Sequence, residues 1–360
     1  MILDLAYATL PLARAEPRGP RRYQAPVDCR GRVGGNGRGM IAASSEQVVP
    51  AAPSASDRAW RALQGASARI PHGQAARIQR AWFELHQLLR TPSFRRTLAL
   101  VREILPPDHS DRDARQAAVG VLLSSHFTGW RLRTLDRCGP DRLTNWVRLS
   151  GLAELERLRQ AGQGAVLVNS QYGAGICVPL LLARRGYAVV SLEGAPHLRL
   201  AGIRDSDRLT ILDISDERTL RLRELRQARR ALKAGGFVHL AGDAYGGRSG
   251  LMLPFHGRAR RFATGFAALA VLAHVPVVPI FATIEVDGHI RVDIMAPLSP
   301  EAGQARGENQ LTSLVRAYAR LLEARWSEAP GNVLAMQLRQ YAVLPRVSEK
   351  AIASPQHESL

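Results

Sequence analysis

Short apolar runs alternate with helix-like stretches between residues 165 and 298, and this alternation constrains the fold more than any other feature of the sequence. The runs have the length of buried strands rather than of buried helices. Strand, helix, strand order predicts a sheet covered by helices. Strands are predicted at 165–168, 188–192, 209–214 and 237–242, and helices at 174–185 and 217–236.

A second group of elements follows this alternation. Another strand is predicted at 251–257, and a helix capped by Thr264 is predicted at 264–274. Two long apolar runs, 275–286 and 289–298, flank Asp287-Gly288, which is a two-residue hairpin signal. An antiparallel hairpin beside strands joined by helices predicts an α/β fold with a mixed central sheet flanked by helices.

The chain before this region is helical, and its first part has little periodicity. Residues 16–56 are rich in Pro, Gly, Arg, Ser and Ala, which predicts disorder, and Met40 is an alternative start. Ser150 is the predicted N-cap of a helix over 150–162. The predicted organisation is a disordered or mis-started segment at 1–56, a helical segment at 57–149, an α/β domain at 150–328, and a C-terminal helix and tail at 329–360.

The chain is strongly basic, with 49 Lys and Arg against 31 Asp and Glu and a formal net charge of +18. Two interpretations stay open: attraction to an anionic surface or an acidic carrier, or scattered arginines that form no patch. The three cysteines are far apart and form no CxxC pair, so no metal site is predicted. Because no apolar run is long enough to span a bilayer, any membrane contact is expected to be peripheral.

Polar residues follow two of the predicted strands, and ligands of α/β sheets bind where strands end. Asn169, Ser170 and Gln171 follow the strand at 165–168, and Asp243 follows the strand at 237–242. The aspartate either orients a substrate or catalytic group or serves as a turn residue. The phosphate-binding P-loop and GxGxxG motifs are absent. The GxSxG motif is also absent, so Ser170 is not indicated as a nucleophile.

A basic stretch after residue 257 and two histidines are further candidates. Arg258, Arg260 and Arg261 either hold a phosphate or carboxylate or form a solvated loop. His239 and His256 lie on or next to predicted strands, where a histidine is more often a core residue than a catalyst. No basic patch interleaved with aromatic residues is present, so nucleic acid is not an expected partner.

Four stretches together resemble the bacterial lipid A biosynthesis (lauroyl/myristoyl) acyltransferases of the lysophospholipid acyltransferase superfamily. They are GLAELERLRQAGQGAVLV, NSQYGAG with the following LLARRGYAVVSL, LKAGGFVHLAGDAYGG, and LMLPFHGRARRFATGFAALAVLAHVPVVPIFA. The resemblance spans about residues 110–328, and its last block is long and specific. It implies a glycerolipid acyltransferase-like fold, an acyl-CoA or acyl carrier protein donor, a lipid or lysolipid acceptor, and no cofactor.

In this family the turn holds a histidine and, after four further residues, an acid. The histidine deprotonates the acceptor hydroxyl, and the acid orients the imidazole. The resemblance places Gln171 at the histidine position and Ile176 at the acid position, and neither side chain can do that work. The backbone N–H groups of Gly173 and Gly175 are expected to suit an oxyanion or phosphate. The resemblance implies catalytic-site residue Asp243 and substrate-binding residues Asn169, Ser170, Tyr172, Gly173, Arg258, Arg260 and Arg261.

Three interpretations follow from the altered motif. The protein transfers acyl groups to a hydroxyl or amine with another base, for which His239 is the candidate. Alternatively, it is an impaired homologue that binds acyl chains, lysolipid or acyl carrier protein. In the third, HFTGWR at 126–131 is a displaced copy of the motif, although Arg131 replaces the acid. The family's N-terminal membrane helix is not evident, so we expect a cytoplasmic protein or one peripheral on an anionic inner-membrane surface.

Overall fold

The computed structural model describes residues 72–106, 108–137, 145–194, 197–200, 202–214, 218–243, 250–299 and 309–346. The disordered segment predicted at 1–56, with its alternative start at Met40, lies outside these residues, as does the end of the C-terminal tail.

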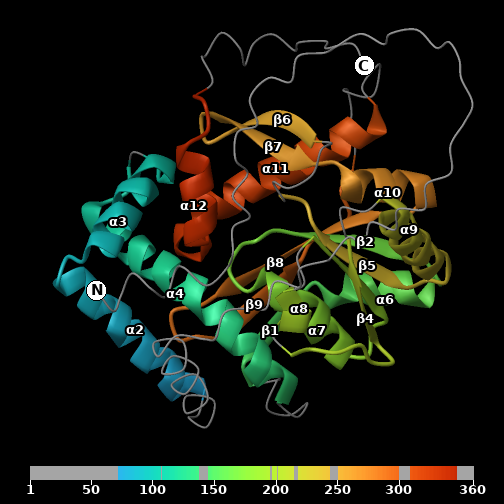
Figure 1. The fold of residues 1–360 in the computed structure, drawn as a ribbon, viewed down its shortest axis with the longest axis horizontal. Helices are drawn as coiled ribbons and strands as arrows, with labels where there is room; N and C mark the ends of the chain where they lie inside the picture. Colours follow the sequence, from blue (N-terminus) through green and yellow to red (C-terminus); the bar gives the residue numbers. More distant parts are fainter. Residues whose placement is uncertain are drawn as a thin grey trace, which may run out of the picture. The chain divides into compact units, whose positions relative to one another are not determined.

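Seven strands form one central sheet in the order β1-β9-β8-β2-β5-β3-β4 (Figure 1). Neighbouring strands are parallel except β8 and β9, which are antiparallel. The prediction of a mixed α/β sheet flanked by helices is therefore confirmed. The strands are β1 (Val147–Ser150), β2 (Ala165–Asn169), β3 (Val189–Glu193), β4 (Leu209–Asp213), β5 (Phe237–Ala241), β8 (Val277–Ile284) and β9 (Ile290–Ile294).

Helices between the parallel strands cover both faces of this sheet. The chain passes outward from β2 to β3 through α7 (Val178–Arg184) and returns from β4 to β5 through α9 (Arg218–Lys233). It continues in the same direction to β8 through α10 (Gly265–Ala273). Right-handed crossovers then place α7 on one face and α9 with α10 on the other. The contact between α9 and α10 agrees with this arrangement.

The outer part of the sheet contains both the predicted hairpin and an unpredicted strand. β8 and β9 pair through Ile284 and Ile290 on either side of the predicted turn. The prediction that Ser150 caps the next helix, α6 (Leu152–Gln160), is wrong, because Ser150 ends β1. The N-cap is Gly151, with φ at +74°, and a Cβ there would lie 2.0 Å from the carbonyl oxygen of Ile294. This link therefore requires glycine.

A separate two-stranded sheet lies above the carboxyl end of the main one, formed by β6 (Gly250–Phe255) and β7 (Arg258–Ala263). The interpretation of Arg258, Arg260 and Arg261 as a solvated loop is wrong, because this stretch is strand β7. Successive side chains of a strand point to opposite faces. Arg260 is buried and Arg261 is exposed, as this alternation requires.

In the described part of the chain, three helices precede the sheet: α2 (His72–Leu88), α3 (Pro92–Ile104) and α4 (Asp111–Arg137), grouped together at one side in Figure 1. The HFTGWR stretch at 126–131 lies inside α4 and not in a turn after a strand, which disfavours a displaced motif. The helix predicted at 174–185 begins as a 3₁₀ turn, η2 (Gly175–Cys177), before α7. Thr264 is the N-cap of α10, but its side chain makes no capping hydrogen bond. Remaining helices are α8 (His197–Leu200), α11 (Gln310–Glu328), η3 (Pro330–Asn332) and α12 (Ala335–Ala342).

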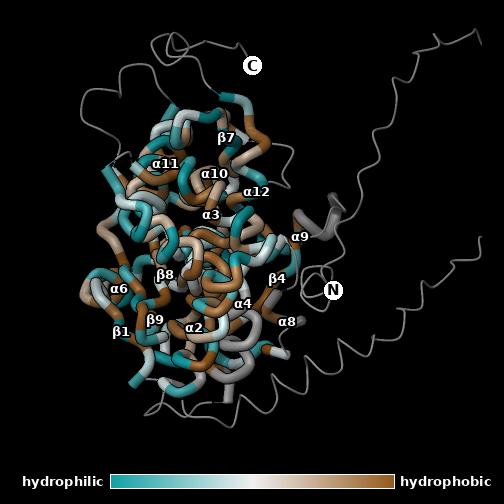
Figure 2. Tube along the Cα trace, turned by 90° about the vertical axis from the view of Figure 1, so that its left-hand side faces the viewer, coloured by the Kyte–Doolittle hydropathy of each residue, from teal (hydrophilic) through white to brown (hydrophobic). Residues whose placement is uncertain are grey.

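Hydrophobic segments run through the middle of the molecule, where the strands lie (Figure 2). All eight residues of β8 are buried, as befits a central strand covered on both faces. Helix α2 departs from this pattern. This helix and the turn after it expose five large apolar side chains to solvent, namely Ile78, Trp82, Leu85, Leu88 and Leu89.

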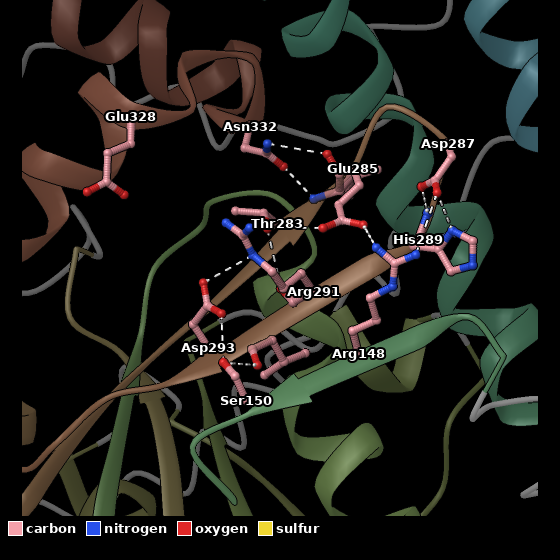
Figure 3. A network of polar contacts seen from close by, with 12 residues as sticks. Arg148, Ser150, Thr283, Glu285, Asp287, His289, Arg291, Asp293, Glu328 and Asn332 are labelled. Carbon is pink, nitrogen blue, oxygen red and sulfur yellow. Dashed lines mark hydrogen bonds and ion pairs between the residues drawn. The ribbon is translucent and has the colours of Figure 1, made fainter.

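A network of charged side chains joins β1, β9 and β8 at the edge of the sheet (Figure 3). Arg148 Nη1 donates to Glu285 Oε2 at 2.7 Å. Asp293 accepts a hydrogen bond from Ser150 Oγ at 2.8 Å and pairs with Arg291 Nε at 3.4 Å. The arginines are well exposed, so water competes with every one of these contacts.

Candidate active site

The turn after β2 lies beside Asp243 because β2 and β5 are neighbouring parallel strands that end together. Asn169, the last residue of β2, is the Cα partner of Ala241, the last residue of β5. Gly242 N donates to Asn169 O at 2.9 Å, which holds the two chains together just beyond the strands. The two polar strand ends noted in the sequence therefore meet in one place.

Asp243 is fully buried and accepts hydrogen bonds from three groups. Ser170 Oγ donates to Oδ2 at 2.5 Å, and the backbone N of Gln171 donates to Oδ1 at 3.2 Å. Arg260 Nη2 lies 3.3 Å from Oδ2 and supplies the opposite charge. A buried carboxylate needs such donors and a countercharge in place of water. Asp243 thus ties the turn after β2 to β7.

Arg260, the countercharge, is completely enclosed. Its guanidinium carbon lies 4.5 Å from the ring centroid of Phe255, 5.2 Å from that of Phe262 and 4.9 Å from that of Trp326. Aromatic faces attract a cation, most strongly where water is excluded. These rings fix the guanidinium in place beside Asp243.

Gln171 is half-buried, and its carboxamide is joined to the same cluster through α12. Gln337 Nε2 donates to Gln171 Oε1 at 2.9 Å, and Gln337 Oε1 accepts from Arg260 Nη2 at 2.9 Å. Gln337 is only 1% exposed. The position that the resemblance gives to a histidine therefore holds an amide that contacts a second, buried amide. Ile176, at the position of the acid, lies in η2 and brings no polar atom.

Three other predicted residues build the turn. Asn169 Nδ2 donates to Gly175 O at 2.9 Å across it. The hydroxyl of Tyr172 is buried within 2.9 Å of Arg325 O and 3.0 Å of Ala329 O, and burial raises the pKa of this phenol well above its usual value. Gly173 has φ at +52°, and a Cβ on it would lie 2.2 Å from Ala282 O.

The expectation that Gly173 and Gly175 offer backbone N–H groups to an oxyanion or phosphate is wrong. Gly173 N donates to Asn332 O at 2.7 Å, and Gly175 N donates to Tyr172 O at 3.0 Å. Ala174 N between them donates to Ala282 O at 2.8 Å. These groups satisfy the fold because the turn is packed against β8 and η3.

The structure does not bring the three arginines together. Arg258 pairs with Glu103 and donates to the carbonyl oxygens of Ala342 and Leu344 at 2.9 Å and 2.8 Å. Arg260 points inward to Asp243, and Arg261 lies on the exposed side of β7. Their binding of an anionic substrate group stays a prediction, and each would act from a different place.

His239 also lies away from the cluster. It stands in the middle of β5, with Leu167 and Ser191 as its Cα partners on the neighbouring strands. Its Nδ1 lies 3.2 Å from Ser191 Oγ, and its Nε2 has no hydrogen-bond partner among the described residues. Burial lowers the pKa of His239 to about 3. This imidazole is neutral at physiological pH and is a weak base.

Two buried polar residues were not predicted from the sequence: Glu193 at the end of β3 and Gln337 in α12. Burial raises the pKa of Glu193, the last residue of β3, to about 7. Its Oε2 accepts from Leu198 N at 3.1 Å. An acid directly after the apolar run at 188–192 was a usable signal for Glu193. Gln337 gave no such signal, because only the packing of α12 shows that its side chain is buried.

The described residues include no group of three or more His, Cys, Asp or Glu placed to hold a metal ion. Within the same ranges, none of the helices combines the length and the apolar character needed to cross a bilayer.

A mixed sheet with a polar turn after β2, an aspartate after β5 and a following strand hairpin has the architecture implied for an acyltransferase-type protein. A family model of bacterial lipid A biosynthesis acyltransferases matches residues 95–331, which is well over half of the chain. The chain belongs to this family. No curated protein matches it. The match ends before α12, so Gln337 lies outside the matched segment.

Proposed function

We propose that the chain binds an acyl-bearing lipid or a carrier-bound acyl group at the turn after β2, without the family's base-catalysed step. The observation that carries this proposal is the amide of Gln171 at the histidine position, held by Gln337. A carboxamide takes up no proton near neutral pH. Ile176 adds an apolar side chain where the family has a charge, and this suits binding of an acyl chain better than proton transfer.

Asp243 does not replace the missing base. Its oxygens already accept from Ser170 Oγ, Gln171 N and Arg260 Nη2. A general base must reach the proton that it removes, so a substrate hydroxyl would have to displace one of these donors. The contacts of Asp243 support a role in holding the shape of the binding turn.

Acyl transfer to a hydroxyl or amine, with His239 as the base, is the second candidate function. The unpartnered Nε2 of this buried imidazole favours it. Its low pKa and its place in the middle of β5 count against it, because an efficient base has a pKa near the working pH and touches the substrate.

The two functions are separated by assaying acyl transfer with the purified full chain. Acyl-CoA and acyl carrier protein serve as donors, and lysolipids and hydroxyacyl compounds serve as acceptors. We expect binding without turnover by the native chain, and turnover by the variant Gln171→His/Ile176→Glu. Turnover by the native chain that disappears in His239→Gln would overturn the proposal and establish the transferase.

A peripheral membrane position is part of the proposal and rests on α2. Ile78, Trp82 and Leu85 are spaced along one side of the helix, and they are exposed. Tryptophan with leucine on one face and arginine nearby is typical of helices that lie in the membrane interface. Exposed Arg77 and Arg90 flank the apolar side chains, so a second copy of this face would bring like charges together, whereas anionic lipid would neutralise them.

Vesicle binding tests this position. The full chain is mixed with phosphatidylcholine vesicles with and without phosphatidylglycerol, and the bound fraction is measured by sedimentation. We expect binding only to the anionic vesicles, weakened roughly tenfold or more in Trp82→Ala/Leu85→Ala. Leu272→Ala is the matched control, since Leu272 is an exposed leucine on α10. Equal binding by the α2 variant and the control would contradict the proposal.

A further inference from the structure

Four side chains form a continuous line of contacts from the buried ion pair to the turn after β2. Asp243 contacts Arg260, Arg260 donates to Gln337, and Gln337 donates to Gln171. Three of the four are at most 1% exposed, and only Gln171 reaches the edge of the cluster. The line joins four places in the fold: the turn after β5, β7, α12 and the turn after β2.

The contact between Arg260 and Gln337 fixes the direction of the contact between Gln337 and Gln171. A guanidinium group has only donors, so the Gln337 atom facing Arg260 must be the carbonyl oxygen Oε1. The amide nitrogen of Gln337 then faces Gln171 and must donate. The atom of Gln171 that accepts this hydrogen bond is Oε1, and its NH₂ group is left for another partner.

The guanidinium of Arg260 cannot rotate away from Gln337. Its guanidinium is held by Asp243 on one side and lies among the rings of Phe255 and Trp326 on the others. Within the described part of the chain, no group accepts a hydrogen bond from Gln171 Nε2. The half-buried position of Gln171 leaves this NH₂ group at the boundary of the site.

We propose that Gln171 Nε2 is a fixed hydrogen-bond donor that selects ligands by an acyl carbonyl oxygen, and that Gln337 is the positioning residue that sets this polarity. The proposal rests on the acyl-binding function given above and adds the feature of the ligand that is recognised. A carbonyl oxygen carries no proton and only accepts, so it complements an amide that only donates. A phosphate oxygen has the same chemistry and is distinguished by the test.

The test uses two ligands that differ at the carbonyl alone. S-palmitoyl-CoA has a thioester carbonyl, and S-hexadecyl-CoA is the thioether with the same chain length and the same phosphates. Calorimetric titration of the full chain is expected to show roughly fivefold tighter binding of the thioester, as one neutral hydrogen bond provides. Gln171→Glu keeps the size of the side chain but has no NH₂ group. In this variant the ratio of the two dissociation constants, thioether to thioester, is expected to fall to about one.

Gln337→Glu changes the polarity of the site without touching the ligand-facing residue. The new carboxylate would accept from both Arg260 and Gln171, so the Gln171 amide would turn its oxygen towards the ligand. We expect the thioester to lose its advantage in this variant. Gln340→Glu on the same helix is the matched control, and it is expected to keep the fivefold ratio. If Gln337→Glu does not fold, Gln337→Met removes the same donor without adding a charge.

Each outcome separates this inference from the function on which it rests. If the native chain binds neither ligand, the acyl-binding function itself fails. If it binds both ligands equally and Gln171→Glu changes neither, the donor role is overturned and acyl binding stands. If Gln171→Glu weakens both ligands equally, Gln171 contacts a phosphate, and recognition of the carbonyl is overturned.

Discussion

One network of arginine and carboxylate is buried at the end of β5, and another is exposed at the edge formed by β1 and β9. In the first, the side chains of Asp243 and Arg260 have no exposed surface. In the second, shown in Figure 3, the side chain of Arg148 is 60% exposed and that of Glu285 is 24% exposed. The residue types are alike, but the buried charges depend on each other, whereas water can replace any partner of the exposed ones.

The difference teaches how the buried pair keeps the turn after β2 in shape. A buried charge cannot lose its partner without a large cost, so the pair fixes every group hydrogen-bonded to it. Ser170, Gln171 and Gln337 are all bonded to this pair. The exposed network imposes no such constraint on β1.

Breaking the buried pair is expected to have the largest effect. Asp243→Ala leaves the guanidinium of Arg260 buried without its carboxylate, which costs about 3–5 kcal/mol of the free energy of unfolding. Urea unfolding measures it. The double variant Asp243→Leu/Arg260→Met removes both charges and is expected to recover much of the loss. A single variant as stable as the native chain would show that the pair is not the anchor of the turn.

Titration of Glu193 gives the next effect and tests a third kind of environment, a buried acid that forms no ion pair with the described residues. Its pKa in the folded chain is about 7 against 4.5 when exposed, so the folded state holds the proton between these values. The free energy of unfolding therefore falls as pH rises from 4.5 to 7.

Glu193→Gln removes this titration. It is expected to gain about 2 kcal/mol relative to the native chain on going from pH 4.5 to pH 8, after allowance for partial solvent screening. Thermal unfolding at both pH values measures the gain. A difference that does not change with pH would contradict the assignment.

A buried but uncharged contact is expected to cost less. Tyr172→Phe removes the hydroxyl that lies against the carbonyl oxygens of Arg325 and Ala329. The expected loss is about 1 kcal/mol, the usual net value of a neutral hydrogen bond. Urea unfolding checks it beside Tyr187→Phe, whose phenol lies on a more exposed part of the chain. Losses as large as that of Asp243→Ala would break the distinction between charged and neutral contacts.

The exposed network is expected to show the smallest effect. Arg148→Ala removes the ion pair with Glu285, and the expected change in the free energy of unfolding is below about 0.5 kcal/mol. Added salt is expected to reduce this change further, because salt screens exposed charges. A loss of several kcal/mol would mean that β1 depends on this network as the turn after β2 depends on Asp243.

The sequence allowed prediction of those parts of the fold that depend on local patterns. The apolar runs located β2, β3, β4 and β5, and Asp287-Gly288 located the hairpin of β8 and β9. The four residues of β1 could not be found, because one short strand at a sheet edge has too little pattern of its own. The strand β7 was hidden by its arginines, of which Arg260 is buried against aromatic rings of other elements.

The site was predictable to a similar degree. The two strand ends, at Asn169 and Asp243, meet because β2 and β5 are parallel neighbours in the sheet. The resemblance places Gln171 and Ile176 at the positions of the family's histidine and acid, and this assignment stays a prediction. The contact of Arg260 with Asp243 and that of Gln337 with Gln171 could not be predicted, because they depend on how β7 and α12 pack against the turn.

The contact between Gln337 and Gln171 joins residues 166 positions apart in the chain. Contacts of such long sequence separation form late, since the loop between them must close first. During synthesis from the N-terminus, α12 leaves the ribosome after every strand of the sheet, and after the whole segment that matches the family. The sheet can therefore assemble before Gln171 acquires its orientation, and docking of α12 completes the site.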